Sequence, residues 1–199
     1  MSNIKRQELT KLTEKLMKRK ECHFQKHEVE RLIIMFCKLT GGCHEKLDRA
    51  KFRDILHKCF CMTDDMLMDR VFRSFDTDTD NYLSHEEWVI GLSIMLHGTY
   101  EEKCNFCFVA YDLNSDGWIS REEMFQLLKN SILKQVSEED QDENIKELVE
   151  IVLKKMDRDH DSRLSLQDFK GTVKEEPLLL EVLGPCLPNK PEHNLGPYS

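Results

Sequence analysis

Residues 112–123 place the strongest limit on how this 199-residue chain can fold. Oxygen-bearing side chains stand at positions 1, 3, 5, 9 and 12 of this segment, and they belong to Asp112, Asn114, Asp116, Ser120 and Glu123. Gly117 at position 6 allows a sharp turn, because a residue without a Cβ reaches left-handed backbone angles at little cost. The backbone carbonyl of Trp118, at position 7, supplies a further oxygen. Calcium prefers an all-oxygen shell of this kind, so the segment predicts a calcium site.

The register of this loop recurs along the chain. Steps of 36 residues toward the N-terminus reach positions 76 and 40, and a step of 45 residues toward the C-terminus reaches position 157. Large apolar residues recur in all four units: Leu47, Leu83, Ile119 and Leu164 at loop position 8, and Phe52, Trp88, Met124 and Phe169 directly after position 12. Because this apolar repeat does not depend on the ligand residues, it predicts an all-α chain of four helix, loop, helix units.

Two further loops carry oxygen ligands. The second offers Asp76, Asp78, Asp80, the Tyr82 carbonyl, Ser84 and Glu87, and the fourth offers Asp157, Asp159, Asp161, the Arg163 carbonyl, Ser165 and Asp168. Asn81 and Ser162 stand where glycine is expected, and Asn tolerates left-handed angles better than most residues. Asp168 is one methylene shorter than Glu, so we expect the fourth site to have fewer oxygens and to tolerate Mg²⁺. The predicted order of calcium affinity is third, second, fourth.

The first unit lacks a ligand set. Thr40, Gly42, His44 and Lys51 occupy its positions 1, 3, 5 and 12. None of these is a carboxylate, and the lysine would repel a cation. We therefore expect a metal-free, structural unit.

With these residues in place, the chain resembles EF-hand proteins, which implies four EF-hand units in two paired lobes, the first hand being degenerate. The resemblance also implies that units pair through a short strand contact at loop position 8. We expect a basic N-terminal helix over residues 1–27, an N-lobe over residues 28–97 and a C-lobe over residues 98–175, with Gly98 as the hinge. A short apolar helix over residues 176–185 and an irregular tail over residues 186–199 are expected to follow.

Both ends of the chain leave alternatives open. The basic helix either packs on the rest of the protein or contacts an acidic partner. The apolar segment of residues 176–185 either completes the C-lobe core or occupies the groove of that lobe until a partner helix displaces it. The acidic residues 137–144 suit a loop that leads into a helix N-terminus.

Composition excludes several classes of function. A net charge of -8 argues against a nucleic-acid binder. The charged N-terminus lacks the apolar core of a signal peptide, so we expect the eight cysteines to be free thiols in a reducing compartment. Ser2 stands where N-myristoylation needs glycine, and no apolar run is long enough for a membrane span, so no membrane anchor is expected. The pair Cys104 and Cys107 is expected in the core rather than on zinc. No nucleophile stands with a base, so we expect no enzyme.

Several finer details resemble the EF-hand proteins of ciliary and flagellar axonemes. These details are the metal-free first hand, residues 62–66 and 69–73, residues 129–131 with the acidic insertion, Asp168, and residues 178–181 followed by 184–188. The resemblance implies a calcium sensor in the cytoplasm, on the axonemal cytoskeleton. The implied partners are the outer dynein arm heavy chain or its docking-complex coiled coil and the doublet microtubule. More distantly, the chain is similar to neuronal calcium sensors and calcineurin B.

Two other functions remain open from the sequence. One is a regulatory subunit that clasps a partner helix regardless of calcium, and the other is a calcium or magnesium buffer. A sensor exposes apolar surface on binding calcium, whereas a buffer barely changes shape.

Overall fold

A computed structural model describes residues 3–42, 45–132 and 141–188 of the chain. Helices dominate it, so the predicted all-α fold is confirmed. The elements are α1 (Asn3–Leu16), α2 (Lys26–Thr40), β1 (Leu47–Asp48), α3 (Arg49–Phe60), α4 (Asp65–Phe75), β2 (Tyr82–Leu83), α5 (His85–His97), α6 (Tyr100–Tyr111), β3 (Trp118–Ile119), α7 (Arg121–Ile132), α8 (Gln141–Met156), β4 (Leu164–Ser165), α9 (Leu166–Glu175) and the 3₁₀ helix η2 (Pro177–Glu181).

The short strands join the helix, loop, helix units in pairs. Strand β1 pairs antiparallel with β2, and β3 pairs antiparallel with β4. Leu47 lies opposite Leu83, and Ile119 lies opposite Leu164. All four side chains are fully buried, which explains why the apolar residue at position 8 recurs. The predicted pairing of units one with two and three with four, at this position, is confirmed.

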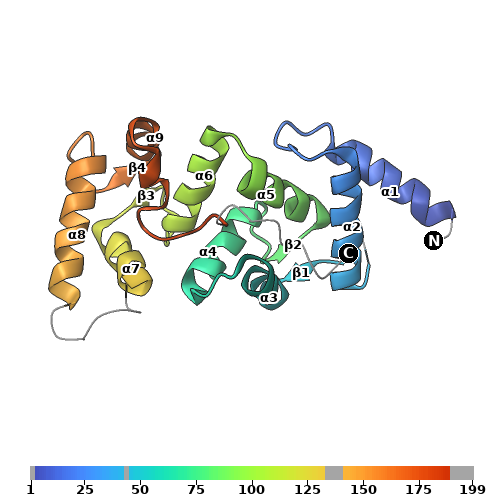
Figure 1. Ribbon diagram of the computed structural model, residues 1–199, viewed down its shortest axis with the longest axis horizontal. Coiled ribbons are helices and arrows are strands. Elements are labelled where there is room, and N and C mark those ends of the chain that lie inside the picture. The colour runs from blue at the N-terminus through green and yellow to red at the C-terminus, as the bar shows by residue number, and fades with distance from the viewer. Residues whose placement is uncertain (1–2, 43–44, 133–140, 189–199) are drawn as a thin grey trace.

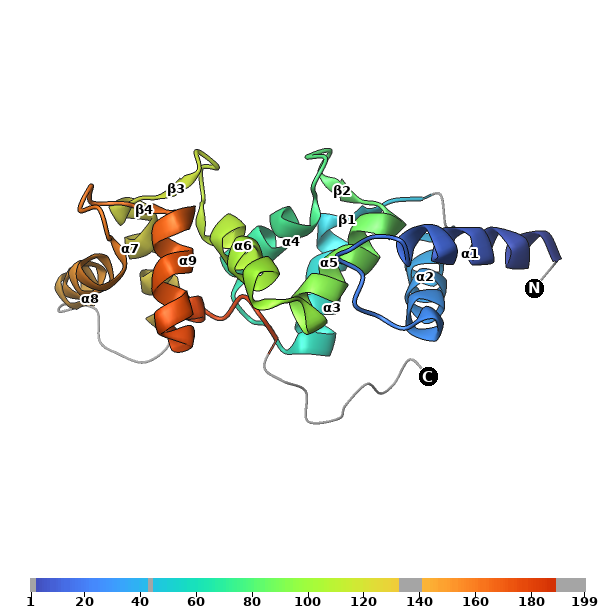
Figure 2. The ribbon, with the colours of Figure 1, turned by 90° about the horizontal axis from the view of Figure 1, so that it is seen from above.

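The molecule is elongated, with α2 to α5 in one half, α7 to α9 in the other, and α6 between them (Figure 1). The loops that lead to β2, β3 and β4 project from the same side (Figure 2). Helices α4 and α6 join the halves: the Ser74 hydroxyl donates to the Phe106 carbonyl at 3.2 Å, and the rings of Phe75 and Phe106 lie 5.8 Å apart. The entering helices of the second and third units therefore pack directly on each other.

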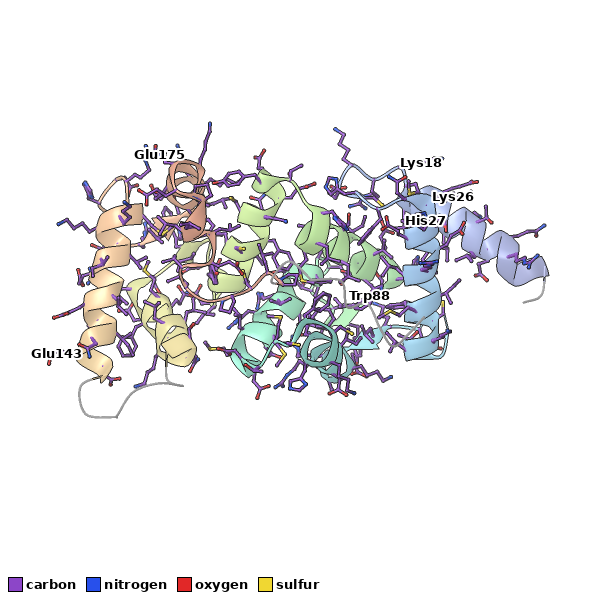
Figure 3. All side chains as sticks on the ribbon, viewed as in Figure 1. Lys18, Lys26, His27, Trp88, Glu143 and Glu175 are labelled. Carbon is purple, nitrogen blue, oxygen red and sulfur yellow. The ribbon has the colours of Figure 1, made fainter. Side chains whose placement is uncertain are left out.

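Aromatic rings form the core of the N-terminal half. Phe52 makes edge contacts with Phe72 and Phe75 at 5.5 and 4.9 Å between ring centroids, and with Trp88 at 6.2 Å. Trp88, labelled in Figure 3, is one of the fully buried side chains. Gly91 on α5 allows the close approach of Phe75, because a Cβ there would lie 2.2 Å from the ring. The residues directly after loop position 12 are thus core residues, as the repeat predicts.

Gly98 separates α5 from α6 at the expected junction between lobes. Its backbone angles are φ -54° and ψ 150°, so it ends α5 in an extended conformation. A Cβ at this position would lie 2.4 Å from the Ile94 carbonyl oxygen. Thr99 then caps α6 by accepting a hydrogen bond from the Glu102 N–H. Glycine is needed at position 98 for steric reasons. The role of Gly98 as a hinge stays a prediction, and so do the predicted lobe boundaries.

The basic N-terminal segment is not one helix, so the prediction for residues 1–27 is wrong in its second half. Helix α1 ends at Leu16, and α2 begins at Lys26 with a capping box formed by Gln25 and Glu28. The run from Lys18 to Lys20 has no apolar residue to bury, so a helix gains nothing by continuing there. Instead the chain turns, and Phe24 packs against His97 at 5.2 Å.

The same N-terminal segment packs on the rest of the protein. Lys15 and Arg19 both contact the Glu86 carboxylate, at 2.7 and 2.8 Å. His23 contacts Glu102 at 2.7 Å, and its backbone N–H donates to the Ser93 hydroxyl. Of the two alternatives, the structure shows contact with the protein's own acidic side chains. The acidic partners lie on α5 and α6.

The C-terminal apolar segment is shorter and tighter than the predicted helix over residues 176–185. It is a 3₁₀ helix that ends at Glu181, and Gly184, at φ 136°, then turns the chain into Pro185. Three successive leucines cannot all face one side of a helix, and Leu178 is 95% exposed. Leu183 is buried, so the segment contributes to the core as the first alternative states. Residues 189–199 of the expected tail lie outside the described part.

Buried polar contacts fix the end of this segment. The Tyr111 hydroxyl donates to the Gly184 carbonyl at 2.5 Å, and the Cys186 sulfur lies 3.0 Å from the Cys107 sulfur. A Cβ on Gly184 would lie within 4 Å of Leu67 on α4 and Ser131 on α7. The segment therefore reaches both halves of the molecule.

The two cysteines expected in the core are buried, but the free-thiol expectation fails at one position. Cys104 and Cys107 are both buried free thiols, as expected for small apolar residues. Burial raises the pKa of Cys107 well above its usual value, and contact with Cys186 raises it further. The expectation that every cysteine is a free thiol is wrong for Cys37, which is disulfide-bonded. Bridging requires two sulfurs to meet in space, which residue spacing alone does not show.

The acidic insertion of residues 137–144 overlaps the start of α8. Helix α8 begins at Gln141, and Asp142 in its first turn pairs with Lys129 of α7 at 2.7 Å. Residues 137–140 of the insertion lie outside the described part.

Among the described helices, none is long and apolar enough to cross a bilayer.

Candidate calcium sites

The first carboxylate of each candidate loop organises the turn. Asp112 accepts the N–H of Asp116 on one oxygen, at 3.2 Å, and the N–H of Gly117 on the other, at 2.9 Å. The second and fourth loops repeat these bonds through Asp76 and Asp157. Each loop therefore holds its position 1 carboxylate turned toward positions 5 and 6. Three loops of different sequence share these two hydrogen bonds to the position 1 carboxylate.

Left-handed residues at two positions make this winding possible. Position 6 has φ of 66° at Asn81, 87° at Gly117 and 69° at Ser162. The loops thus adopt the expected turn even where glycine is absent, at some steric cost for the serine. Position 4 is also left-handed, in Thr79, Ser115 and His160. Sequence reasoning missed position 4, because these three residue types share no preference for that conformation.

The last carboxylate differs between the loops. Glu123 accepts the Asn114 N–H on one oxygen, at 2.9 Å, and the Ser120 N–H and hydroxyl on the other, at 2.7 Å each. Glu87 bridges the second loop similarly, from Thr77 and Asp78 to Ser84. Asp168 contacts Ser165 at its own end of the loop. The shorter side chain makes none of the cross-loop bonds that the two glutamates make, which supports a weaker fourth site.

Cations already contact two of the loops. The Lys46 ammonium pairs with Asp80 at position 5 of the second loop. In the fourth loop, Arg163 donates from Nε to Asp161 at 2.8 Å, and its guanidinium lies 3.8 Å from the centre of the Trp118 ring. The corresponding Asp116 of the third loop instead accepts the neutral Asn114 amide, at 3.0 Å. Calcium has to displace a positive charge in loops two and four, so the geometry favours the third loop.

The negative charges of the acidic ligands in the second loop repel one another. Burial raises the pKa of Asp76, and the carboxylates of Glu87 and Asp78 raise it further. Burial also disfavours the charged form of Glu87, but hydrogen bonds from Ser84, Thr77 and Asp78 outweigh it and lower the pKa of this group. Asp76, Asp78 and Asp80 offer oxygens within 4.8 Å of one another, as do Asp157, Asp159 and Asp161. Such clusters suit a divalent cation, which removes the repulsion.

The first loop has a different local structure. Thr40 is the last residue of α2, and its hydroxyl donates to the Gly42 carbonyl at 2.8 Å. Lys51, at position 12, lies 3.6 Å from Asp48 and donates its backbone N–H to the same carboxylate. His44 lies outside the described residues. The observed contacts stabilise the start of α3 rather than enclose a cation, which supports a metal-free unit.

Arg163→Gln is expected to raise the calcium affinity of the fourth site about fivefold, equivalent to ~1 kcal/mol. The substitution removes the cation that occupies an Asp161 oxygen. Arg158→Gln is the matched control, because Arg158 lies in the same loop but pairs with Glu175. Site-resolved NMR titration of both variants measures the effect. Equal changes in the two variants would show that general charge, rather than the contact with Asp161, sets the affinity.

The paired loops, position 8 strands and twelve-residue ligand pattern define an EF-hand calcium-binding protein. Residues 101–174 match the model of an EF-hand domain pair, and residues 67–91 match that of an EF hand. The chain belongs to the calaxin family of EF-hand proteins. It is 60% identical to calaxin of Xenopus laevis, over 84% of this chain and 83% of the relative.

Further relatives agree with this assignment. The chain is 56% identical to human calaxin, over 94% of this chain and 90% of the relative. A more distant relative is calcineurin B type 2 of Bos taurus, which is 31% identical over 76% of this chain and 85% of its own length. The predicted family membership is confirmed by the calaxins, and the more distant resemblance to calcineurin B is also confirmed.

Proposed function

We propose that this calcium-binding regulatory protein is a calcium sensor of the ciliary or flagellar axoneme. Its three ligand-bearing loops are those of residues 76–87, 112–123 and 157–168, and the ligands are the eighteen residues predicted from the loop pattern. Calcium is the main ion, and the fourth loop, closed by Asp168, is the one that tolerates Mg²⁺.

The observation that carries the proposal is the position of the closing glutamates. Glu87 and Glu123 lie in the first turns of α5 and α7, and the next residues, Trp88 and Met124, are buried in the core. A calcium ion that draws in either carboxylate also pulls on the adjacent core side chain. Ion binding is therefore mechanically connected to helix packing, as a sensor requires.

The proposed partners follow from the family rather than from a surface. We assign the outer dynein arm heavy chain, or the docking-complex coiled coil beside the doublet microtubule, as the target whose activity the sensor adjusts. The role is regulatory rather than catalytic. The packed α1 segment leaves less of the basic surface for an acidic partner, because Lys15, Arg19 and His23 already contact Glu86 and Glu102.

Two measurements on the full chain test this function. We expect a hydrophobic dye to bind more strongly in calcium than in chelator, because lobe opening exposes apolar surface. We also expect binding to salt-washed axonemes to change with calcium. Calcium binding without a change in dye signal would favour a buffer. Axonemal binding of equal strength in calcium and chelator would favour a constitutive subunit, and no axonemal binding would overturn the assigned location.

A further inference from the structure

An arginine-rich pocket lies between α3 and α4. Its lining consists of Arg49, Arg53, Asp65, Met66, Asp69, Arg70 and Arg73. The pocket has a volume of about 510 Å³, which is much more than one small anion fills. Four guanidinium groups and two carboxylates give it an excess of positive charge, although the whole chain has a net charge of -8.

The two carboxylates neutralise only half of the arginines. Arg49 pairs with Asp69 at 2.9 Å, and Arg53 pairs with Asp65. In the described part of the chain, neither Arg70 nor Arg73 forms an ion pair. Burial lowers the pKa of Arg70, and the charge of Arg73 lowers it further, while Asp69 and Glu123 act in the opposite direction. Positive charge that is partly desolvated and unpaired favours an anionic ligand.

The spacing of these two arginines suits an extended chain. They stand three residues apart on α4, so their side chains are neighbours on one helix face, about 5–6 Å apart at Cβ. In an extended peptide, side chains two residues apart lie on the same side, separated by roughly 6.5–7 Å. Two acidic residues at alternate positions therefore match the two free guanidinium groups.

The size of the pocket and the spacing of its arginines favour a peptide over inorganic phosphate. One phosphate ion fills only part of about 510 Å³, whereas an extended segment carries two carboxylates at a separation that matches the two free guanidinium groups. Asp69 is already engaged with Arg49 through Oδ2, and its Oδ1 is buried.

We propose that this pocket binds an extended acidic segment of a protein partner, with two of its carboxylates on Arg70 and Arg73. The surface goes beyond the calcium-sensing role, since it holds a partner through α3 and α4 rather than through the loops. It provides a contact that does not require a lobe to open.

A fluorescent peptide with glutamate and alanine alternating tests the proposal on the full chain. We expect the double variant Arg70→Gln/Arg73→Gln to bind it at least tenfold more weakly at low salt. Arg6→Gln/Arg31→Gln is the matched control, because it removes the same charge from exposed positions on α1 and α2. We expect the control to keep the affinity within about twofold, and inorganic phosphate at the same concentration not to displace the peptide.

Three results would overturn the assignment: equal losses in both double variants, no loss in the pocket variant, or displacement by phosphate. Measurements in calcium and in chelator keep this test separate from the sensor role, because Arg70 also interacts electrostatically with Glu123. Thermal unfolding of each variant controls for folding. A pocket variant that folds normally but loses the peptide supports the site even if the dye experiment shows no calcium-dependent opening.

Discussion

Glu123→Gln is expected to weaken calcium binding at the third site roughly 100-fold, which corresponds to about 2.7 kcal/mol. The substitution keeps the size of the side chain but removes the charge and one of the two carboxylate oxygens. Glu123 is buried and bridges Asn114 to Ser120, so no neighbouring acid replaces it. NMR titration that follows the Gly117 amide measures the affinity of this site directly.

Two controls isolate the contribution of the ligand. Glu122→Gln removes the same charge from the adjacent, exposed position and is expected to change the affinity less than threefold. Lys51→Gln alters position 12 of the metal-free first unit and is expected to leave the third site unchanged. If Glu123→Gln binds calcium as the unaltered protein does, the closing ligand of this loop is not Glu123, and the sensor role does not depend on it.

Phe75→Ala is expected to destabilise the protein by about 3–5 kcal/mol, the usual cost of removing a buried ring from a packed core. Phe75 packs on Phe52 and Phe106 and against Gly91, so it joins α3, α4, α5 and α6. The cavity would therefore weaken both the N-terminal core and the contact between halves. Urea unfolding in chelator measures the loss without a contribution from bound calcium.

The position of the two tryptophans makes this experiment more informative. Trp88 lies in the N-terminal core, and Trp118 lies on β3 in the other half. We expect the Phe75→Ala transition at Trp88 to occur at lower urea than the one at Trp118. Leu178→Ala, at an exposed position, is the control and is expected to change stability by less than about 0.5 kcal/mol. Equal stability of Phe75→Ala and the unaltered protein would contradict the packing described here.

The loops were the most predictable part of this protein. Each ligand is fixed by its place in twelve consecutive residues, so the pattern that identifies Asp112 and Glu123 also determines their local geometry. The limit of that reasoning is visible at position 4, where Thr79, Ser115 and His160 are left-handed without a residue preference that indicates it. The weaker closure by Asp168 was predictable, because side-chain length is a property of the residue itself.

What the sequence determined by itself was the all-α repeat, since it depends on short-range spacing. The pairing at position 8 was implied by the family resemblance and is confirmed by the strands, whereas the affinity ranking of the loops stays a prediction. Only the tertiary structure decided which distant groups meet. Lys46 pairs with Asp80 of the second loop, Lys15 and Arg19 contact Glu86, and the arginines of α3 and α4 line one pocket. Long cationic side chains reach several ångströms in any direction, so their partners depend on how helices pack rather than on their order in the chain.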